Sequence, residues 1–224
     1  MVAWAPWCHG AGDPKKYRTL TDTEMFRILD HACRDRHLWT LALYGLRRGE
    51  IAGLQWCNVN LTDKPVGQGD GQLPPKSVRI VENRVVLGKQ RVESGTPKSK
   101  ASRRTLPLPD DAVQALKAAR QRQREERLKL GEGYGGGEYV CSDEMGSPLH
   151  PDAITSRWQK LLRDMGIAYV RLYDARHSCA TLMHFRGTPI AVIATFPVTS
   201  SACLIIARRR RTSRGNCGSP MSIS

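Results

Sequence analysis

Two arginines and a carboxylate within the short segment GLRRGEIAGLQW, residues 45–56, carry the clearest chemical signal in this 224-residue chain. If the segment is helical, positions i, i+3, i+4 and i+7 counted from its first arginine share one face. These positions hold Arg47, Glu50, Ile51 and Leu54. The two apolar residues mark that face as buried, so we expect Arg47 to point inward beside Glu50 and Arg48 to point away. A buried guanidinium needs a paired anion, and the donors that Glu50 leaves over suit a phosphate group. The alternative is an ordinary amphipathic helix with an internal Arg–Glu pair.

A second arginine on an apolar helical face stands far downstream, in RLYDARHSCATLMHFRG, residues 171–187. With helical spacing, Arg176 shares one stripe with apolar side chains and is followed by His177. The stripe consists of Leu172, Ala175, Cys179 and Met183. Taken alone, an arginine of this kind is more often structural than functional.

Between these segments lies the basic stretch TPKSKASRRTLPLP, residues 96–109. It precedes a short β-rich run, so we expect a hairpin with lysines near its tip. Lys98 is the candidate functional residue, and Lys100 is a neighbour that could be mistaken for it. The alternative is a solvated basic hairpin tip.

Together the three segments resemble the catalytic motifs of the tyrosine recombinases, the phage integrase family. The first is similar to the family's T-G-L-R-x-G-E-I-x-x-L-x-W box, with Tyr44 where threonine is usual. The second is similar to its His-x-x-Arg box, in which Arg176 is followed by His177 and Tyr173 stands where the family usually has histidine. The third resembles the hairpin whose lysine precedes an Arg-x-Ile/Leu-Pro-Leu strand, and Lys98 is the matching residue.

The resemblance implies attack by a tyrosine hydroxyl on a DNA phosphate, leaving a 3′-phosphotyrosyl link and a free 5′ hydroxyl. Arg47 and Arg176 would stabilise charge on the non-bridging oxygens. Lys98 would protonate the leaving oxygen, and Tyr173 would donate a hydrogen bond or handle the proton of the nucleophile. The supporting residues in this scheme are Glu50 and His177. The reaction needs no metal and no small-molecule cofactor, and we expect neither.

The nucleophile of this scheme is missing from the sequence. In the family it lies some 30 residues beyond the second arginine, after a further His/Trp box, but here the family pattern ends at Ala194. From Thr195 onward there is no tyrosine, histidine or tryptophan, and Arg208 to Arg211 form a basic run. We interpret this tail as disordered. A shifted reading frame is a hypothesis for its origin, and it fails if neither other frame past codon 194 encodes a Gly-His-type box and a tyrosine.

Three interpretations of present activity stay open. The first is a recombinase domain by lineage that binds DNA but cannot cleave it. The second is a non-catalytic DNA-binding or regulatory remnant that occupies sites or pairs with an intact recombinase. The third is an inactive, unstable gene relic. Whether the chain is an enzyme in its present form is therefore not decided by the sequence.

Composition agrees with a nucleic-acid partner. The formal net charge is +14, which is typical of polyanion binders, and double-stranded DNA is the expected partner; RNA or an anionic membrane surface is the alternative for charge alone. The seven cysteines are scattered and include no C-x-x-C, so we expect no disulfide framework, no zinc site and a cytoplasmic location. No 18-residue apolar stretch and no signal peptide is found, so we expect no membrane association.

The elements that must position these residues are helices with a small antiparallel sheet. We therefore expect an α+β fold, mainly α, of the tyrosine-recombinase catalytic type, incomplete at the C-terminus. The expected domains are an N-terminal arm, 1–15, a catalytic-type domain, 16–194, and the aberrant basic tail, 195–224.

The expected helices follow the capping signals and the apolar periodicity of the sequence. They span residues 21–32, 37–44, the first arginine box, 110–130, 151–165, the segment around Arg176 and a short segment from Pro189. The expected strands span residues 78–82, 85–87, 105–108 and 139–141. The stretch RQRQREERLK, Arg120–Lys129, is interpreted as a solvated helix face, with DNA contact as the alternative.

Overall fold

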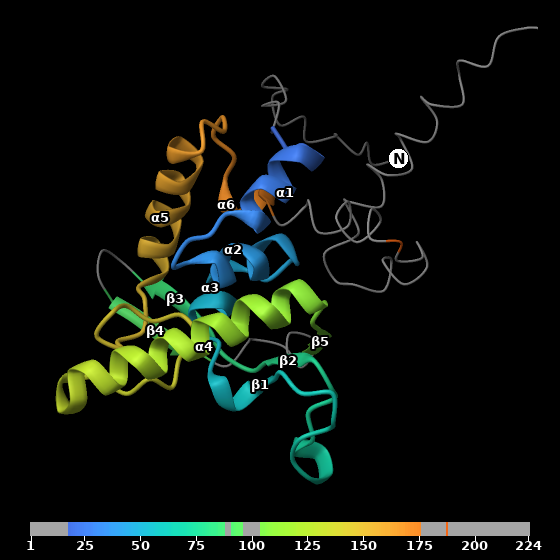
Figure 1. Ribbon diagram of the computed structural model, residues 1–224, viewed down its shortest axis with the longest axis vertical. Coiled ribbons are helices and arrows are strands. Elements are labelled where there is room, and N and C mark those ends of the chain that lie inside the picture. The colour runs from blue at the N-terminus through green and yellow to red at the C-terminus, as the bar shows by residue number, and fades with distance from the viewer. Residues whose placement is uncertain (1–17, 88–90, 96–103, 176–186, 188–224) are drawn as a thin grey trace, which may run out of the picture.

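The computed structural model describes residues 18–87, 91–95, 104–175 and 187 (Figure 1). Its α-helices are α1 Asp22–Asp30, α2 Arg36–Leu43, α3 Arg48–Ala52, α4 Asp110–Leu130, α5 Pro151–Asp164 and α6 Leu172–Ala175. Short 3-10 helices are η1 Trp56–Asn58, η2 Gly69–Gly71 and η4 Gly131–Gly133. The strands are β1 Val59–Asn60, β2 Ser77–Ile80, β3 Asn83–Leu87, β4 Arg91–Gly95 and β5 Arg104–Pro107. The expected α+β class with a small antiparallel sheet is confirmed.

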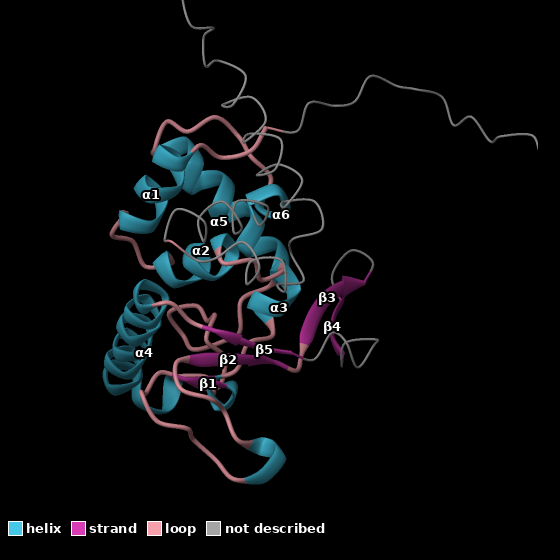
Figure 2. Cartoon of the chain, turned by 90° about the vertical axis from the view of Figure 1, so that its right-hand side faces the viewer, coloured by secondary structure: helices cyan, strands magenta, loops and turns pink. Residues whose placement is uncertain are grey.

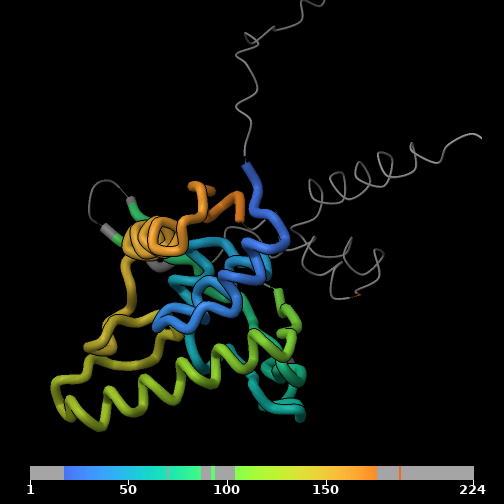
Figure 3. Tube along the Cα trace, turned by 45° about the horizontal axis from the view of Figure 1, so that its top comes forward, coloured from blue at the N-terminus to red at the C-terminus, as the bar shows by residue number. Residues whose placement is uncertain are grey.

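Helix α2 lies at the centre of the arrangement. It contacts α1, α3, α4 and α6, while α3 also packs against α5 and β3. Figure 2 shows α4 on one side of the molecule and α3 with the β3–β4 hairpin on the other. In the tube view, α4 runs along one edge, with α5 and α6 at the opposite edge (Figure 3). Among the described helices, none is both long and apolar enough to cross a membrane.

Two small antiparallel sheets complete the fold. One has the strand order β1-β2-β5, and the other is the hairpin of β3 and β4. Within the first sheet, Ile80 of β2 pairs with Arg104 at the start of β5. The sheet therefore places Arg104 at the strand end that follows the undescribed residues 96–103.

Local capping explains where the helices begin. Thr21 accepts a hydrogen bond from the Glu24 backbone N–H, and the Glu24 carboxylate accepts one from the Thr21 backbone N–H, which completes a capping box at α1. At α5, Pro151 occupies the first turn and His150 caps the Asp152 backbone N–H. These helix starts agree with the boundaries expected from the sequence.

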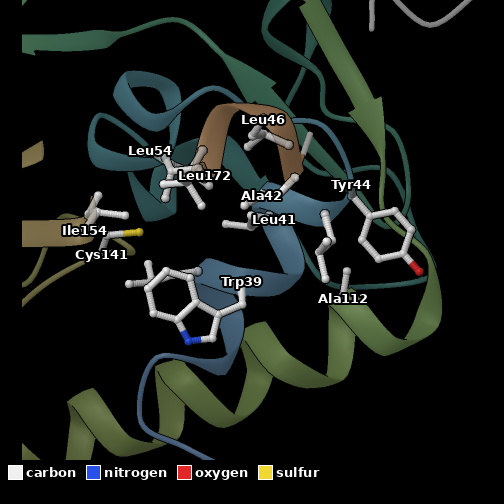
Figure 4. Packing of buried hydrophobic residues seen from close by; sticks show 14 of the residues in the cluster. Trp39, Leu41, Ala42, Tyr44, Leu46, Leu54, Ala112, Cys141, Ile154 and Leu172 are labelled. Carbon is white, nitrogen blue, oxygen red and sulfur yellow. The ribbon is translucent and has the colours of Figure 1, made fainter. Parts of the chain in front are cut away.

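The core is formed by apolar side chains of all the helices and of β2 (Figure 4). Trp39 of α2 and Trp158 of α5 are both buried, with ring centroids 5.4 Å apart. The indole N–H of Trp158 donates to the Val170 carbonyl at 2.8 Å, which satisfies the only polar atom of that side chain. Ile154, one turn before Trp158 on α5, is fully buried.

Some expectations about elements are corrected, and others fall outside the described residues. Residues 139–141 do not form a strand, because Tyr139 makes only an isolated bridge to Gln55. Strand β4 was not expected from the sequence, since its polar residues lack the apolar alternation of a half-buried strand. The helix around Arg176, the helix from Pro189, the N-terminal arm and the basic tail lie outside the described residues.

The packing of α5 generates a stability prediction. Replacing Ile154 with alanine leaves a cavity in the core, so we expect the free energy of unfolding to fall by about 2–5 kcal/mol. The matched control is Gln159→Ala on the exposed face of the same helix, which should change it by less than about 0.5 kcal/mol. Urea titration followed by circular dichroism measures both. Equal stability of the two variants would contradict the described packing.

Candidate functional site

The carboxylate of Glu50 holds two arginines that come from distant parts of the chain. Its oxygens accept hydrogen bonds from both terminal nitrogens of Arg104, each at 2.9 Å, in a bidentate arrangement. Arg47 Nη1 donates to the same carboxylate at 3.0 Å, and the Arg47 backbone N–H donates to it at 2.8 Å. We call this group, Arg47, Glu50 and Arg104, the Glu50 clamp.

Burial makes the charge of Glu50 depend on its partners. The side chain of Glu50 is 4% exposed and that of Arg104 is 12% exposed. Burial by itself raises the pKa of the Glu50 carboxyl, but hydrogen bonds from Arg104 and from the Arg47 backbone outweigh it and lower the pKa below its ordinary value of 4.5. Glu50 is therefore an anion at neutral pH, and the clamp as a whole carries one net positive charge.

The local sequence explains how α3 presents this group. Arg47 is the N-cap residue of α3, with an extended backbone, and Glu50 at the third helical position bonds back to it. Gly49 lets the helix approach β3 closely, because a Cβ at this position would lie 2.0 Å from the Asn83 side-chain oxygen and 2.8 Å from the Arg84 carbonyl oxygen. The Arg-x-Gly-Glu spacing thus gives both the cap and the close contact with β3.

The expectation that Arg47 lies on a buried helix face is wrong. The helix begins one residue later than that reasoning required, so Arg47 is outside it, and its side chain is 48% exposed. Glu50 and Ile51 are buried as expected, and Leu54 is buried just beyond the helix. Arg47 is therefore held by Glu50 on one side and open to solvent on the other.

The exposed side of Arg47 lines a cavity of about 330 Å³. Its walls come from the loop before α3, from α5, and from the chain leading into α6. The lining residues are Leu46, Arg47, Arg48, Thr155, Tyr169, Arg171, Leu172 and Tyr173. We call it the Arg47 cavity. Three guanidinium groups and two tyrosine rings around one opening suit an oxyanion such as a phosphate group.

Not all of this positive charge is available to a ligand. Arg48 Nη1 is paired with the Asp152 carboxylate at 2.8 Å and donates to the Thr155 hydroxyl at 3.1 Å. The expectation that Arg48 points away from the site is therefore also wrong, because it lines the same cavity as Arg47. Asp152 is exposed, so this ion pair contributes little stability and can open when an anion competes for Arg48.

The structure brings together three of the six site residues expected from the sequence. Arg47 and Tyr173 line the cavity, and Glu50 holds Arg47 from behind. Tyr173 is exposed on α6. Lys98, Arg176 and His177 lie outside the described residues, although Arg176 directly follows Ala175, the last residue of α6.

Sequence reasoning did not identify Arg104 as part of the site. The sequence does contain a signal for Arg104, because the strand pattern Arg-x-Leu-Pro-Leu begins at this residue. In the sequence analysis that pattern serves only to locate the lysine before it. Arg171 was also missed, because it stands outside the helical stripe that drew attention to Arg176. In the described part of the chain, no three His, Cys, Asp or Glu side chains come together in a way that could hold a metal ion.

Tyr44, which replaces the threonine usual in the resembling motif, does not line the Arg47 cavity. Its hydroxyl lies 3.0 and 2.9 Å from the two carboxylate oxygens of Asp111 on α4, and the residue is buried (Figure 4). The tyrosine side chain therefore ties the end of α2 to α4.

Comparison of the sequence with known proteins gives consistent matches. The sequence profile described as Phage integrase family matches residues 18–196. A "Tyrosine recombinase XerC-like" protein from Caldanaerobacter subterraneus subsp. tengcongensis is 31% identical over 183 residues, covering 79% of this chain and 46% of that protein. An "Integrase" from Streptomyces ambofaciens is 27% identical over 187 residues, covering 82% and 46%. The chain spans less than half the length of these curated relatives.

Solved structures share the fold at low sequence identity. The Tn1549 transposon integrase, in complex with transposon right end DNA, superposes with a TM-score of 0.60 at 13% identity, covering 90% of this chain and 67% of that one. The XerA recombinase gives a TM-score of 0.59 at 17% identity, covering 92% and 66%. At these identities the likeness is one of fold, and it agrees with the helical architecture around α2.

The buried Glu50 clamp generates a prediction about stability and its dependence on pH. Replacing Glu50 with glutamine leaves Arg104 buried without an anion, so we expect the free energy of unfolding to fall by about 3 kcal/mol at pH 7. Because the folded-state pKa of Glu50 is lowered, its contribution is full above the unfolded pKa near 4.5 and is lost as the pH falls through the lower folded pKa. The difference between wild type and variant should therefore shrink below about pH 4.5.

Denaturant titrations at several pH values measure this difference. The control is Glu132→Gln in the exposed η4 turn, which should change stability by less than about 0.5 kcal/mol. A Glu50→Gln variant as stable as the wild type at pH 7 would show that the clamp does not hold in solution.

Proposed function

The chain belongs to the phage integrase family, and we propose that it is a DNA-binding recombinase domain that cannot cleave DNA in its present form. The observation that carries this proposal is the Glu50 clamp, which holds Arg47 at a cavity lined by further arginines and tyrosines. That arrangement suits a phosphodiester, because guanidinium groups match phosphate oxygens in geometry and charge.

The proposed roles follow the chemistry of phosphoryl transfer. Arg47 and Arg176 would stabilise charge on the non-bridging oxygens of the scissile phosphate. Lys98 would protonate the leaving oxygen, since an ammonium group can give up its proton. Tyr173 would donate a hydrogen bond to the phosphate. The supporting residues would be Glu50, through the clamp, and His177.

The proposed loss of cleavage rests on the sequence. Tyr173 is the last tyrosine of the chain, and it occupies the position of a hydrogen-bond donor in the second arginine box. No tyrosine stands some 30 residues beyond Arg176, where the family places its nucleophile. Residues 16–194 would form the catalytic-type domain, with an arm at 1–15 and a basic tail at 195–224, and the protein would act in the cytoplasm.

Double-stranded DNA is the proposed partner. The net charge of +14 supports attraction to a polyanion. Related folds have been solved with DNA bound, including the Tn1549 transposon integrase with transposon right end DNA. Pairing with an intact recombinase, which would make the chain a regulator, is the second candidate function, and it is favoured by the combination of an arranged Arg47 cavity with a missing nucleophile.

Absence of cleavage is directly testable. We expect that incubation with supercoiled plasmid, followed by denaturation with detergent, leaves no protein covalently attached to DNA and no relaxed circles. The reason is that no side chain equivalent to the family's tyrosine is present to attack the phosphate. A type IB topoisomerase in parallel shows that the assay detects both products. A covalent adduct would contradict the prediction, and mass spectrometry of the attached peptide would then identify the nucleophile.

Binding through the Arg47 cavity is tested separately. Arg47→Gln should weaken binding of a labelled duplex and reduce the slope of log affinity against log salt by about one, since one phosphate contact is lost. Fluorescence anisotropy at several salt concentrations measures the slope. The control is Arg163→Gln, which removes an exposed charge that does not line the cavity. Equal slopes for the two variants would argue against a phosphate contact by Arg47.

A further inference from the structure

A second group of arginines lies on α4, away from the Arg47 cavity. Arg120, Arg124 and Arg127 are spaced i, i+4 and i+7, so they share one flank of the helix. We call them the arginine row. Figure 2 shows α4 on the side of the molecule opposite to α3, and α2 contacts both helices. The row is therefore separate from the proposed catalytic surface.

The arginine row borders a cavity of about 200 Å³ whose walls contain no carboxylate. The lining residues are Trp56, Arg120, Gln123, Arg124, Arg127, Tyr134 and Gly137. Some other arginines of the described chain pair with acidic side chains, as Arg34 does with Glu126 and Arg157 does with Asp35. Within the described residues, none of the three arginines of the row forms an ion pair. The cavity therefore concentrates positive charge that no carboxylate in its walls neutralises.

A buried hydroxyl in the same cavity wall is also unused. Tyr134 is 9% exposed, and its hydroxyl has no hydrogen-bond partner among the described residues. The ring cannot move away easily, because it packs against Gly146, where an added Cβ would lie 2.5 Å from Tyr134 Cε1. Buried hydroxyl groups are nearly always hydrogen-bonded, so an unpaired hydroxyl on a residue that lines this cavity points to a missing partner.

Two further lining residues, Trp56 and Gln123, are held in place by hydrogen bonds. Trp56 Nε1 donates to the Gln123 side-chain oxygen at 2.7 Å, and Gln123 in turn donates to the Val140 carbonyl at 3.0 Å and the Ser142 hydroxyl at 2.8 Å. The Arg120 guanidinium lies over the Trp56 ring, 5.3 Å from its centroid. The ring face is thus covered, so this wall is built to hold a guanidinium in place rather than to stack a base.

We propose that this cavity and the arginine row form a second phosphate-binding site, and that its ligand is the backbone of a nucleic-acid strand. Guanidinium donors and a hydroxyl match the oxygens of a phosphodiester. The row extends over about 10 Å of helix, which suits a line of successive phosphates better than a single anion. The protein would in this way contact a duplex segment beyond the one at the Arg47 cavity.

The test compares two triple variants of the full chain that remove the same charge. R120Q/R124Q/R127Q removes the row, whereas K117Q/K129Q/R163Q removes three exposed cations that do not line the cavity. Binding of a labelled 30-base-pair duplex is followed by fluorescence anisotropy at several salt concentrations. We expect the row variant to reduce the salt slope by about two to three and the control variant to reduce it by less than one. Equal slopes would overturn the proposal.

A conservative variant tests the hydroxyl. Tyr134→Phe keeps the ring packing and removes only the unpaired hydroxyl. We expect this variant to bind the duplex more weakly and to unfold at a temperature no lower than that of the wild type. Unchanged binding would overturn the role of Tyr134 in the site. Combining R120Q/R124Q/R127Q with R47Q separates the two surfaces. Removing the row should still weaken duplex binding when R47Q has already impaired the Arg47 cavity.

Competition identifies the ligand class. Inorganic phosphate is added to each protein–duplex complex, and sodium chloride of the same ionic strength serves as the control. We expect phosphate to displace the duplex from the wild type no more effectively than from the row variant. If it displaces the duplex from the wild type alone, the site takes isolated phosphate and the nucleic-acid assignment is overturned. A polyglutamate peptide gives the other outcome. If it binds the wild type but not the row variant, and both bind the duplex equally, the surface is assigned to an acidic protein instead.

Discussion

One buried carboxylate, Glu50, serves two guanidinium groups, and the geometry of the candidate site depends on this sharing. The carboxylate is ionised although it is buried, because hydrogen bonds from the Arg104 side chain and the Arg47 backbone offset its desolvation. One negative charge cannot cancel two positive ones, so the clamp leaves a net positive charge. Arg47 carries that surplus to the cavity surface, because it is the partner that solvent reaches. The ion pairs that stabilise Glu50 in the core therefore also leave a positive charge at the Arg47 cavity.

The clamp works because it joins rigid elements. Arg104 is fixed by its pairing with Ile80 in the β1-β2-β5 sheet. Glu50 is fixed in α3, which packs on β3 through Gly49. The sheet and the helix thus meet at the Glu50 carboxylate, which in turn holds Arg47.

Much of the helical layout could be predicted from local signals, since Thr21 and Pro151 mark helix starts through groups that lie within one turn. The geometry of the candidate site was harder to predict from the sequence. Periodicity placed Arg47 on a buried face because it assumed that the helix continued through that residue, but a capping geometry cannot be distinguished from a first helical turn by spacing alone. Arg104 could not be found in this way, because its contact with Glu50 spans 54 positions in the sequence and depends on the sheet register. Long-range ion pairs of this kind are set by tertiary packing.

The arginines of the described chain differ in the number of carboxylates around them. Arg34 and Arg157 each meet an acidic side chain from another element and thereby connect helices across the core. Arg47 shares its carboxylate with a second arginine, and the arginine row on α4 has none in its cavity. An arginine held in place without full neutralisation costs the fold electrostatic energy. A bound anion would lower that cost, which is why we propose anion binding at Arg47 and at the arginine row and not at every arginine of a basic chain.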